Sequence, residues 1–373
     1  MSVRNAVLCL LLFIVPACAT KPPQAPGADA QVVIRNAALV LDAWDDHARS
    51  DHSSADASGL SSQLDLLRKS STASQDMPIE MARTYYIARI EGTLALYPQE
   101  AGGTIDHAMA DDALRNFDTV LAYKHDLPEW NVRLVEANYA AGSVSWAIDG
   151  TSERTLRYWN DCAQQGHPGC INNIAFELTK KSSASDGDIR RALDLHATVV
   201  RSGNTARCAA QFSAVTMALL IHLTGVQRPG EDQVALLDKA QNLYQTYKNA
   251  TRTQDPCGGG RIGLYEFMIR LDRGERQDAY LNDVLQQSAS PFWRMLAGYL
   301  QDKVSDTELN KAIAADPEGA CSYHFLAAWR AVQKHEQKVA RTHYVAMIEL
   351  TVEDCGPSTL MMQRYLKMPV PAS

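Results

Sequence analysis

The chain has 373 residues, of which 46% are hydrophobic, and its formal net charge at pH 7 is −7. An apolar fraction of this size supports a folded core, so extensive disorder is excluded. A mildly acidic chain without a lysine and arginine cluster argues against nucleic acid as a partner. We therefore expect a folded protein whose partner is not a nucleic acid.

The first seventeen residues have the pattern of a secretory signal peptide. A short polar start carries one cation, Arg4, and an apolar run follows from Ala6 to Val15. This run is too short to cross a bilayer as a stable helix, which favours a cleaved signal over a transmembrane segment. No later apolar stretch reaches the length of a membrane span, so the rest of the chain is expected to be soluble.

The apolar run ends in Val15-Pro16-Ala17-Cys18, which resembles the lipobox of bacterial lipoproteins. The resemblance implies cleavage before Cys18 and attachment of diacylglycerol to its sulfur. Only a thiolate is nucleophilic enough for this acylation. The alternative interpretation is an ordinary signal peptide followed by an incidental cysteine.

The residues after Cys18 have the composition of a tether. Three prolines and one glycine lie between Ala19 and Ala30, and such a segment acts as a semi-rigid spacer. In enterobacterial lipoproteins, a residue other than aspartate after the cysteine, here Ala19, implies sorting to the outer membrane. We therefore predict residues 18–30 to be a lipidated tether that faces the periplasm and contacts the membrane only through its acyl chains.

Beyond the tether, apolar residues recur with the period of an α-helix, and no segment alternates as a strand does. Prolines fall between the periodic segments, where a missing amide hydrogen is tolerated. The pattern predicts helices at 31–49, 56–70, 78–97, 106–124, 128–142, 151–165, 168–181, 187–202, 205–226, 231–250, 258–273, 276–288, 291–302, 305–315, 319–335, 338–353 and 357–367. Most connections are short, so the chain is expected to be all-α with antiparallel neighbouring helices.

Two stretches resemble known helical repeats. Residues 312–350 resemble a tetratricopeptide repeat, and residues 160–175 resemble the related Sel1-like repeat. The residues that carry these resemblances are Ala312-Ile313-Ala314-Ala315-Asp316-Pro317 with Tyr323, Leu326, Ala327, Ala340 and Tyr344, and Ala163-Gln164-Gln165-Gly166 with Cys170. The resemblance implies a right-handed superhelix of stacked antiparallel hairpins, an α-solenoid, over residues 31–367, with a disordered tail at 368–373.

Six cysteines remain once Cys9 and Cys18 are set aside. An even number in an exported chain suggests up to three disulfides, although six cysteines allow 15 connectivities and buried free thiols are the alternative. Five of the six lie near the start of the first helix of a hairpin. The preferred pairing is Cys162–Cys170, which closes a helix-turn-helix, with Cys208–Cys257 and Cys321–Cys355, which join neighbouring repeats. The three residues Cys162, His167 and Cys170 are a weaker metal alternative, because no fourth ligand is apparent.

Known catalytic motifs are absent from the sequence. His335-Glu336 begins a metalloprotease pattern, but Val339 occupies the position of the second zinc ligand. Gly258-Gly259-Gly260 lacks the lysine of a phosphate-binding loop and is expected to allow close backbone packing instead. We therefore predict no catalytic residue, no metal and no cofactor.

The remaining candidate site is the surface formed by the first helices of the hairpins, which such repeats use for binding. Aromatic residues and arginine are enriched at binding hot spots, although the same residue types also pack between repeats. The residues predicted to face a partner are Trp130, Arg133, Asn138, Asn172, Asn173, Gln211, Glu266, Arg270, Arg294, His324 and Arg330.

The sequence favours a non-catalytic adaptor in the cell envelope that binds a protein or peptide. Two alternatives remain open. One is a protein that regulates a peptidoglycan hydrolase or itself acts on glycan, and the other is a periplasmic inhibitor or immunity protein. A pair of carboxylates within one cleft would favour the catalytic form of the first alternative.

Overall fold

The structure, a computed structural model, describes residues 28–48, 57–70, 77–100, 104–123, 128–181, 183–203, 208–251, 255–315, 319–350 and 355–368. Within these residues the chain is helical and contains no strand, so the predicted all-α class is confirmed. No helix in this part of the chain is long and apolar enough to cross a membrane. The predicted signal peptide, Cys18, most of the tether and residues 369–373 lie outside the described residues.

Each predicted helix has an observed counterpart, and the one predicted at 258–273 is divided into a 3-10 helix and an α-helix. In chain order they are α2 (Ala28–Ala48), α3 (Ser58–Lys69), α4 (Met77–Glu100), α5 (His107–Ala122), α6 (Pro128–Asp149), α7 (Glu153–Gln164), α8 (Pro168–Lys180), α9 (Asp186–Ser202), α10 (Ala209–Thr224), α11 (Gln233–Thr251), the 3-10 helix η2 (Pro256–Arg261), α12 (Ile262–Asp272), α13 (Ala279–Gln287), α14 (Pro291–Leu300), α15 (Asp306–Ala315), α16 (Gly319–Gln333), α17 (Gln337–Glu349) and α18 (Gly356–Tyr365).

The largest difference from the predicted boundaries is in α6, which continues from the predicted end at residue 142 to Asp149. Glycine often ends a helix, but Gly142 has a packing role here. A Cβ atom at Gly142 would lie only 2.4 Å from the ring of Trp159 in α7. The missing side chain therefore lets two neighbouring helices pack closely while the helix itself continues.

Two kinds of contact organise the helices. Consecutive helices pack against one another, as antiparallel hairpins do, and the even-numbered helices also contact the next even-numbered helix at α2–α4, α4–α6, α8–α10, α10–α12, α14–α16 and α16–α18. The even-numbered helices are the first helices of the predicted hairpins. The pairs α6–α8 and α12–α14 are not among these contacts.

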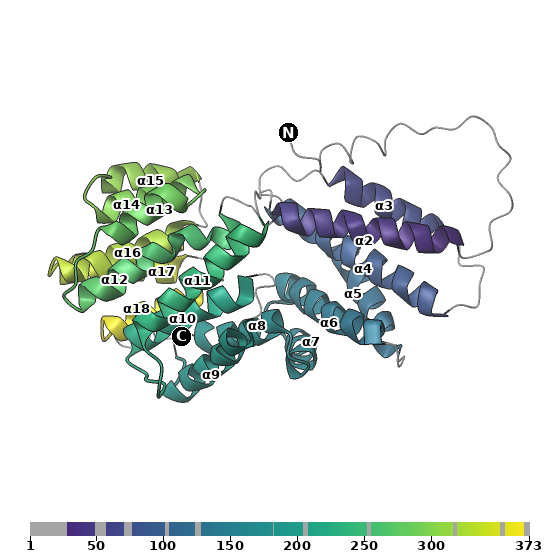
Figure 1. The fold of residues 1–373 in the computed structure, drawn as a ribbon, viewed down its shortest axis with the longest axis horizontal. Coiled ribbons are helices and arrows are strands. Elements are labelled where there is room, and N and C mark those ends of the chain that lie inside the picture. The colour runs from purple at the N-terminus through teal and green to yellow at the C-terminus, as the bar shows by residue number, and fades with distance from the viewer. Residues whose placement is uncertain are drawn as a thin grey trace.

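The last helix departs from this sequential order, because α18 returns to pack on α8 and α10 near the middle of the chain (Figure 1). Gly356 makes this approach possible, since a Cβ atom there would lie 2.4 Å from the carbonyl oxygen of Lys180. Arg364 then donates to the carbonyl oxygen of Ala184 at 2.8 Å and pairs with Asp186 at 3.2 Å. The last helix therefore packs against helices from the middle of the chain.

The hydrophobic core reflects the same division. Helices α2 to α4 share a small cluster that includes Leu60, Leu67 and Ile90, and a second cluster lies around Leu114 and Phe117. Most of the buried apolar side chains from Ala184 to Met362 form one large core, while Val199, Ala209 and Ala210 belong to a separate small cluster with Ile171. The returning α18 contributes to this core, which explains why it is shared by helices far apart in sequence.

Two of the predicted disulfides are confirmed. Cys162 is bonded to Cys170, and Cys321 is bonded to Cys355. Cys208 is also disulfide-bonded. The side chain of Cys257, its predicted partner, lies outside the described residues. The Cys321–Cys355 bond joins α16 to the residue immediately before α18, and so holds the returning helix at its start.

Candidate functional site

A cleft of about 410 Å³ lies between α11, α12 and α13. All of its side chains are polar, and three of them are carboxylates. The lining residues are Asp238, Gln241, Asn242, Gly260, Gly263, Glu266, Tyr280, Asp283 and Gln287. Asp238 and Asp283 are exposed on the two outer helices, whereas Glu266, from the helix between them, is 5% exposed. The cleft therefore has acidic walls and an acidic floor.

Two glycines of this cleft lie where η2 and α12 approach α13. Gly260, Gly263 and Glu266 follow one another at intervals of three residues, close to one helical turn, so they share one side of η2 and α12. A Cβ atom at Gly263 would lie 2.4 Å from the carbonyl oxygen of Tyr280. At Gly260 it would lie 2.7 Å from the backbone of Ser288. These glycines thus allow α13 to approach α12, as expected from the sequence for the glycine run.

The buried carboxylate at the floor is held by a cation from its own helix. Arg270 donates from Nε to Oε1 of Glu266 at 3.0 Å, and its guanidinium lies 5.0 Å from the centre of the Tyr280 ring. Burial raises the pKa of Glu266, hydrogen bonds from Arg270 and Tyr280 oppose this rise, and the charge of Asp238 adds to it. Within the part of the chain that the structure describes, no lysine or arginine lines the cleft itself. The excess of carboxylates favours a cationic ligand group.

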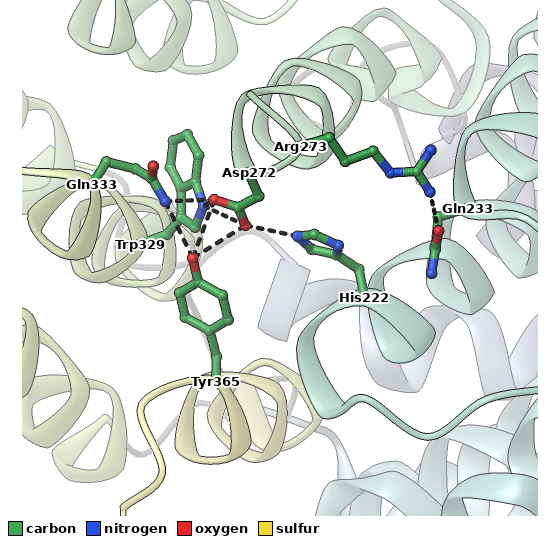
Figure 2. A network of polar contacts seen from close by, with 7 residues as sticks. All are labelled: His222, Gln233, Asp272, Arg273, Trp329, Gln333 and Tyr365. Atoms are coloured by element: carbon green, nitrogen blue, oxygen red, sulfur yellow. Dashed lines mark hydrogen bonds and ion pairs between the residues drawn. The ribbon is translucent and has the colours of Figure 1, made fainter. Parts of the chain in front are cut away.

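A second polar cluster centres on Asp272, the last residue of α12 (Figure 2). Its carboxylate accepts hydrogen bonds from His222 Nε2 at 2.7 Å, from Trp329 Nε1 at 3.1 Å and from the Tyr365 hydroxyl at 3.1 Å. Gln333 Nε2 donates to the same carboxylate. These donors belong to α10, α16 and α18, and 10% of the Asp272 side chain is exposed. Asp272 therefore connects four helices at the end of the helix that carries the cleft floor.

The hydrogen bonds of this cluster all point toward Asp272. Four donors surround its two oxygens, and a carboxylate group has enough acceptor sites for all of them. Burial raises the pKa of Tyr365, and the charge of Asp272 adds to this effect, so the tyrosine remains a hydrogen-bond donor. The neighbouring Arg273 points away from this cluster and contacts Gln233 at the start of α11 (Figure 2). The cluster joins helices, and none of its residues lines the cleft.

A buried serine, histidine and asparagine meet between α8, α9 and α10. His196 Nδ1 lies 3.1 Å from Asn172 Oδ1, and the Ser213 hydroxyl donates to that same oxygen. A serine nucleophile needs the histidine itself as its base and access to substrate. The Ser213 oxygen also lies 3.3 Å from His196 Nδ1, but Ser213 is fully buried and has no access to substrate. This trio therefore fixes the packing of three helices.

Acidification should destabilise the protein through His196. Burial lowers the pKa of His196 to about 4 in the folded chain, against about 6.5 in the unfolded chain. Between these values only the unfolded chain binds the proton, so the stabilisation is complete above about pH 6.5 and is lost as the pH falls toward 4. The difference of about 2.5 pH units corresponds to about 3 kcal/mol.

Urea denaturation at several pH values from 7 to 4 measures this loss. A His196→Gln variant should be less stable at pH 7 but should lose clearly less stability on acidification than the wild type. Parallel pH profiles for the two proteins would show that His196 is not the titrating group.

The predicted metal alternative at Cys162, His167 and Cys170 does have its three side chains close together, since their ligand atoms lie within 4.8 Å of one another. However, the two sulfur atoms are joined in a disulfide. His167 Nδ1 accepts from the amide of Cys170 at 3.3 Å, and Nε2 lies 3.3 Å from Glu136 Oε1. Both ring nitrogens thus have partners, and His167 serves as the N-cap of α8.

Three of the residues predicted to face a partner are buried in helix contacts. Trp130, Asn138 and Gln211 are each 5% exposed or less. Trp130 Nε1 donates to the carbonyl oxygen of Tyr123 at 3.0 Å, and Asn138 Nδ2 donates to that of Leu134 at 3.1 Å. These three side chains therefore pack the array and present little surface to a partner.

Other predicted residues are half-buried and already engaged within the chain. Arg133 lies over the ring of Trp130, and Arg330 lies 3.9 Å from the centre of the Tyr299 ring. Arg294 donates to the carbonyl oxygens at the end of α13. The amide of Asn173, in the orientation that satisfies both partners, bridges Trp159 and Gly169. Asn172 belongs to the buried trio described above.

Only Glu266 and Arg270 of the predicted set come together at the cleft. Asp238, Tyr280 and Asp283 lie on second helices, which are not part of the predicted binding surface. The available signal was the glycine spacing before Glu266. Glycines on one side of a helix indicate a place where a neighbouring helix can approach closely.

Comparison of the chain with models of protein families, with curated proteins and with solved structures finds no match. The function is therefore inferred from the residues and their geometry alone.

Proposed function

We propose that this chain is a lipid-anchored, non-catalytic binding protein of the bacterial cell envelope that holds a protein or peptide partner on its array of helical hairpins. The signal-like N-terminus and the lipobox-like sequence before Cys18 support the location. The contacts between successive first helices support a repeat array of the tetratricopeptide or Sel1-like kind. Disulfide bonds within the described residues agree with an oxidising compartment.

The observation that carries the proposal is the acidic cleft between α11, α12 and α13. Its volume of about 410 Å³ suits a long side chain or a short peptide segment. Three carboxylates and several amides line it, so we expect the partner to insert a lysine or arginine side chain. The exposed Asp238 and Asp283 would attract the cation, and the buried end of the cleft would exclude water around it.

Site-specific photo-crosslinking in the envelope tests this proposal. A photoreactive residue at Asn242, which lines the cleft, should give a defined adduct with a partner. The double variant Asp238→Asn with Asp283→Asn should reduce that adduct about tenfold, since two charge contacts of up to about 1 kcal/mol each are removed. A matched Asp161→Asn variant, changed at an exposed position of α7, should retain the adduct. An adduct of equal yield in all three proteins would contradict the proposal.

The anchor is tested with the same full-length protein. Cys18→Ala should abolish incorporation of labelled fatty acid and release the chain from the membrane fraction, because the acyl chains supply the membrane affinity. A variant that remains in the membrane fraction without its label would show that another part of the chain holds it there.

A role in acting on glycan is the second candidate, and the carboxylates of the cleft are the observation that favours it. Glycan hydrolysis uses one carboxylic acid with a raised pKa beside a second, ionised carboxylate. The pKa of Glu266 is raised by burial, and Asp238 and Asp283 line the same cleft. Against this role, Glu266 is already bonded to Arg270. Hydrolysis of purified peptidoglycan that disappears in Glu266→Gln would establish the enzyme in place of the adaptor.

An inhibitor or immunity protein would also be a binding protein, with a toxin or lysozyme as its partner.

A further inference from the structure

Two histidines face each other across the hairpin of α16 and α17, away from the acidic cleft. His324 Nδ1 lies 3.0 Å from His343 Nδ1, and the two ring centres are 5.3 Å apart. Both side chains are partly buried, and the ring of Tyr323 packs against both of them. The two helices form an antiparallel pair with extensive contact, so these nitrogens are held in place by the fold.

The separation of the two nitrogens matches that of two ligands on one metal ion. A zinc–imidazole bond is about 2.0–2.1 Å long. Two such bonds at an angle between 90° and 109° place the nitrogens about 2.9–3.4 Å apart. The observed 3.0 Å lies in this range. A single Nδ1–H···Nδ1 hydrogen bond fits the same distance, so the two arrangements differ in whether a proton or a metal ion occupies the gap.

A carboxylate lies beside the two rings. The Asp306 carboxylate lies near His343 and accepts from the Tyr323 hydroxyl at 3.4 Å. It supplies negative charge beside the two rings without being one of their hydrogen-bond partners.

We propose that His324 and His343 bind one divalent transition-metal ion through their Nδ1 atoms, with the Nε2 atoms directed to other partners or solvent. Imidazole ligands suit Cu²⁺, Ni²⁺ and Zn²⁺, and Cu²⁺ binds such sites most tightly. Among the described residues, no third cysteine, histidine or carboxylate joins this pair in a closed ligand set. The ion therefore keeps open coordination positions, which water or a group from a partner occupies.

Titration of the mature, untagged full chain with Cu²⁺ tests this site. We expect one equivalent to bind, with an electron paramagnetic resonance spectrum that shows two imidazole nitrogens. His324→Ala and His343→Gln should each weaken binding at least as much as the loss of an outer-shell partner does, about 10–100-fold. His107→Ala, at an exposed position of α5, should leave both affinity and spectrum unchanged.

A thermal melt of each protein without metal shows whether it is folded, and added Cu²⁺ should raise the melting temperature of the wild type and of His107→Ala only. Equal binding by the wild type and both site variants would overturn the proposal. A wild-type spectrum with fewer than two nitrogen ligands would overturn it as well. None of these results depends on whether the acidic cleft binds a partner.

Discussion

Replacing Asp272 with alanine should lower the free energy of unfolding by about 3–5 kcal/mol, as measured by urea denaturation at pH 7. The substitution leaves His222, Trp329, Gln333 and Tyr365 without their shared acceptor. Each buried donor without a partner costs about 1–3 kcal/mol. The loss should be large because the four donors come from three different helices, and no single helix can rotate to satisfy them all.

Asp302→Asn is the control for this prediction. Asp302 also pairs with Arg330 and Lys334, but 62% of its side chain is exposed. Its φ is +61°, which asparagine tolerates better than alanine does. Removing an exposed ion pair should cost less than about 1 kcal/mol. If the two variants lost the same small amount, water would be reaching the Asp272 cluster, and its role in joining the helices would be refuted.

Removing the Cys321–Cys355 disulfide should have the second largest effect. The bond closes a loop with a sequence separation of 34 residues, for which the chain-entropy model gives about 4 kcal/mol. The double variant Cys321→Ser with Cys355→Ser should therefore unfold at a clearly lower urea concentration than the wild type. Because Cys355 directly precedes α18, hydrogen exchange should also show that α18 opens before the rest of the core.

The Cys162–Cys170 bond supplies the comparison. Its sequence separation is only 8 residues, so the same model gives about 2.5 kcal/mol for its removal. The serine pair at 162 and 170 should also leave the protection of α18 unchanged. Equal protection of α18 in both double variants would mean that packing on α8 and α10 holds this helix without help from the disulfide.

The acidic cleft and the histidine pair make different demands on the chain. The cleft needs glycine at positions 260 and 263, where side chains would collide with α13. The histidine pair needs only two facing positions on a hairpin, and its surroundings then set the proton affinity of both rings. A binding function at the cleft and a metal at the hairpin can therefore be lost independently by substitution.

The sequence by itself determined the helices, whereas the cysteine pairing that it favoured was one of 15, and the structure shows two of its three bonds. Helical periodicity and proline placement depend on residues within one or two turns, so each predicted helix has an observed counterpart. Gly142 shows the limit of such local reasoning. Its role is set by Trp159 on another helix, and the sequence pattern alone indicates a helix end there.

Only the tertiary structure decided where polar groups gather. The partners of Asp272 lie 50 to 93 residues away along the chain, and nothing local to any of them indicates the others. The return of α18 to α8 places Arg364 against a carbonyl oxygen 180 residues earlier. Likewise, the walls of the cleft come from α11 and α13. The helix α13 can approach α12 because Gly263 has no Cβ atom to meet its backbone. Local sequence thus sets each helix, while the long-range packing of these helices sets the surfaces on which the protein can act.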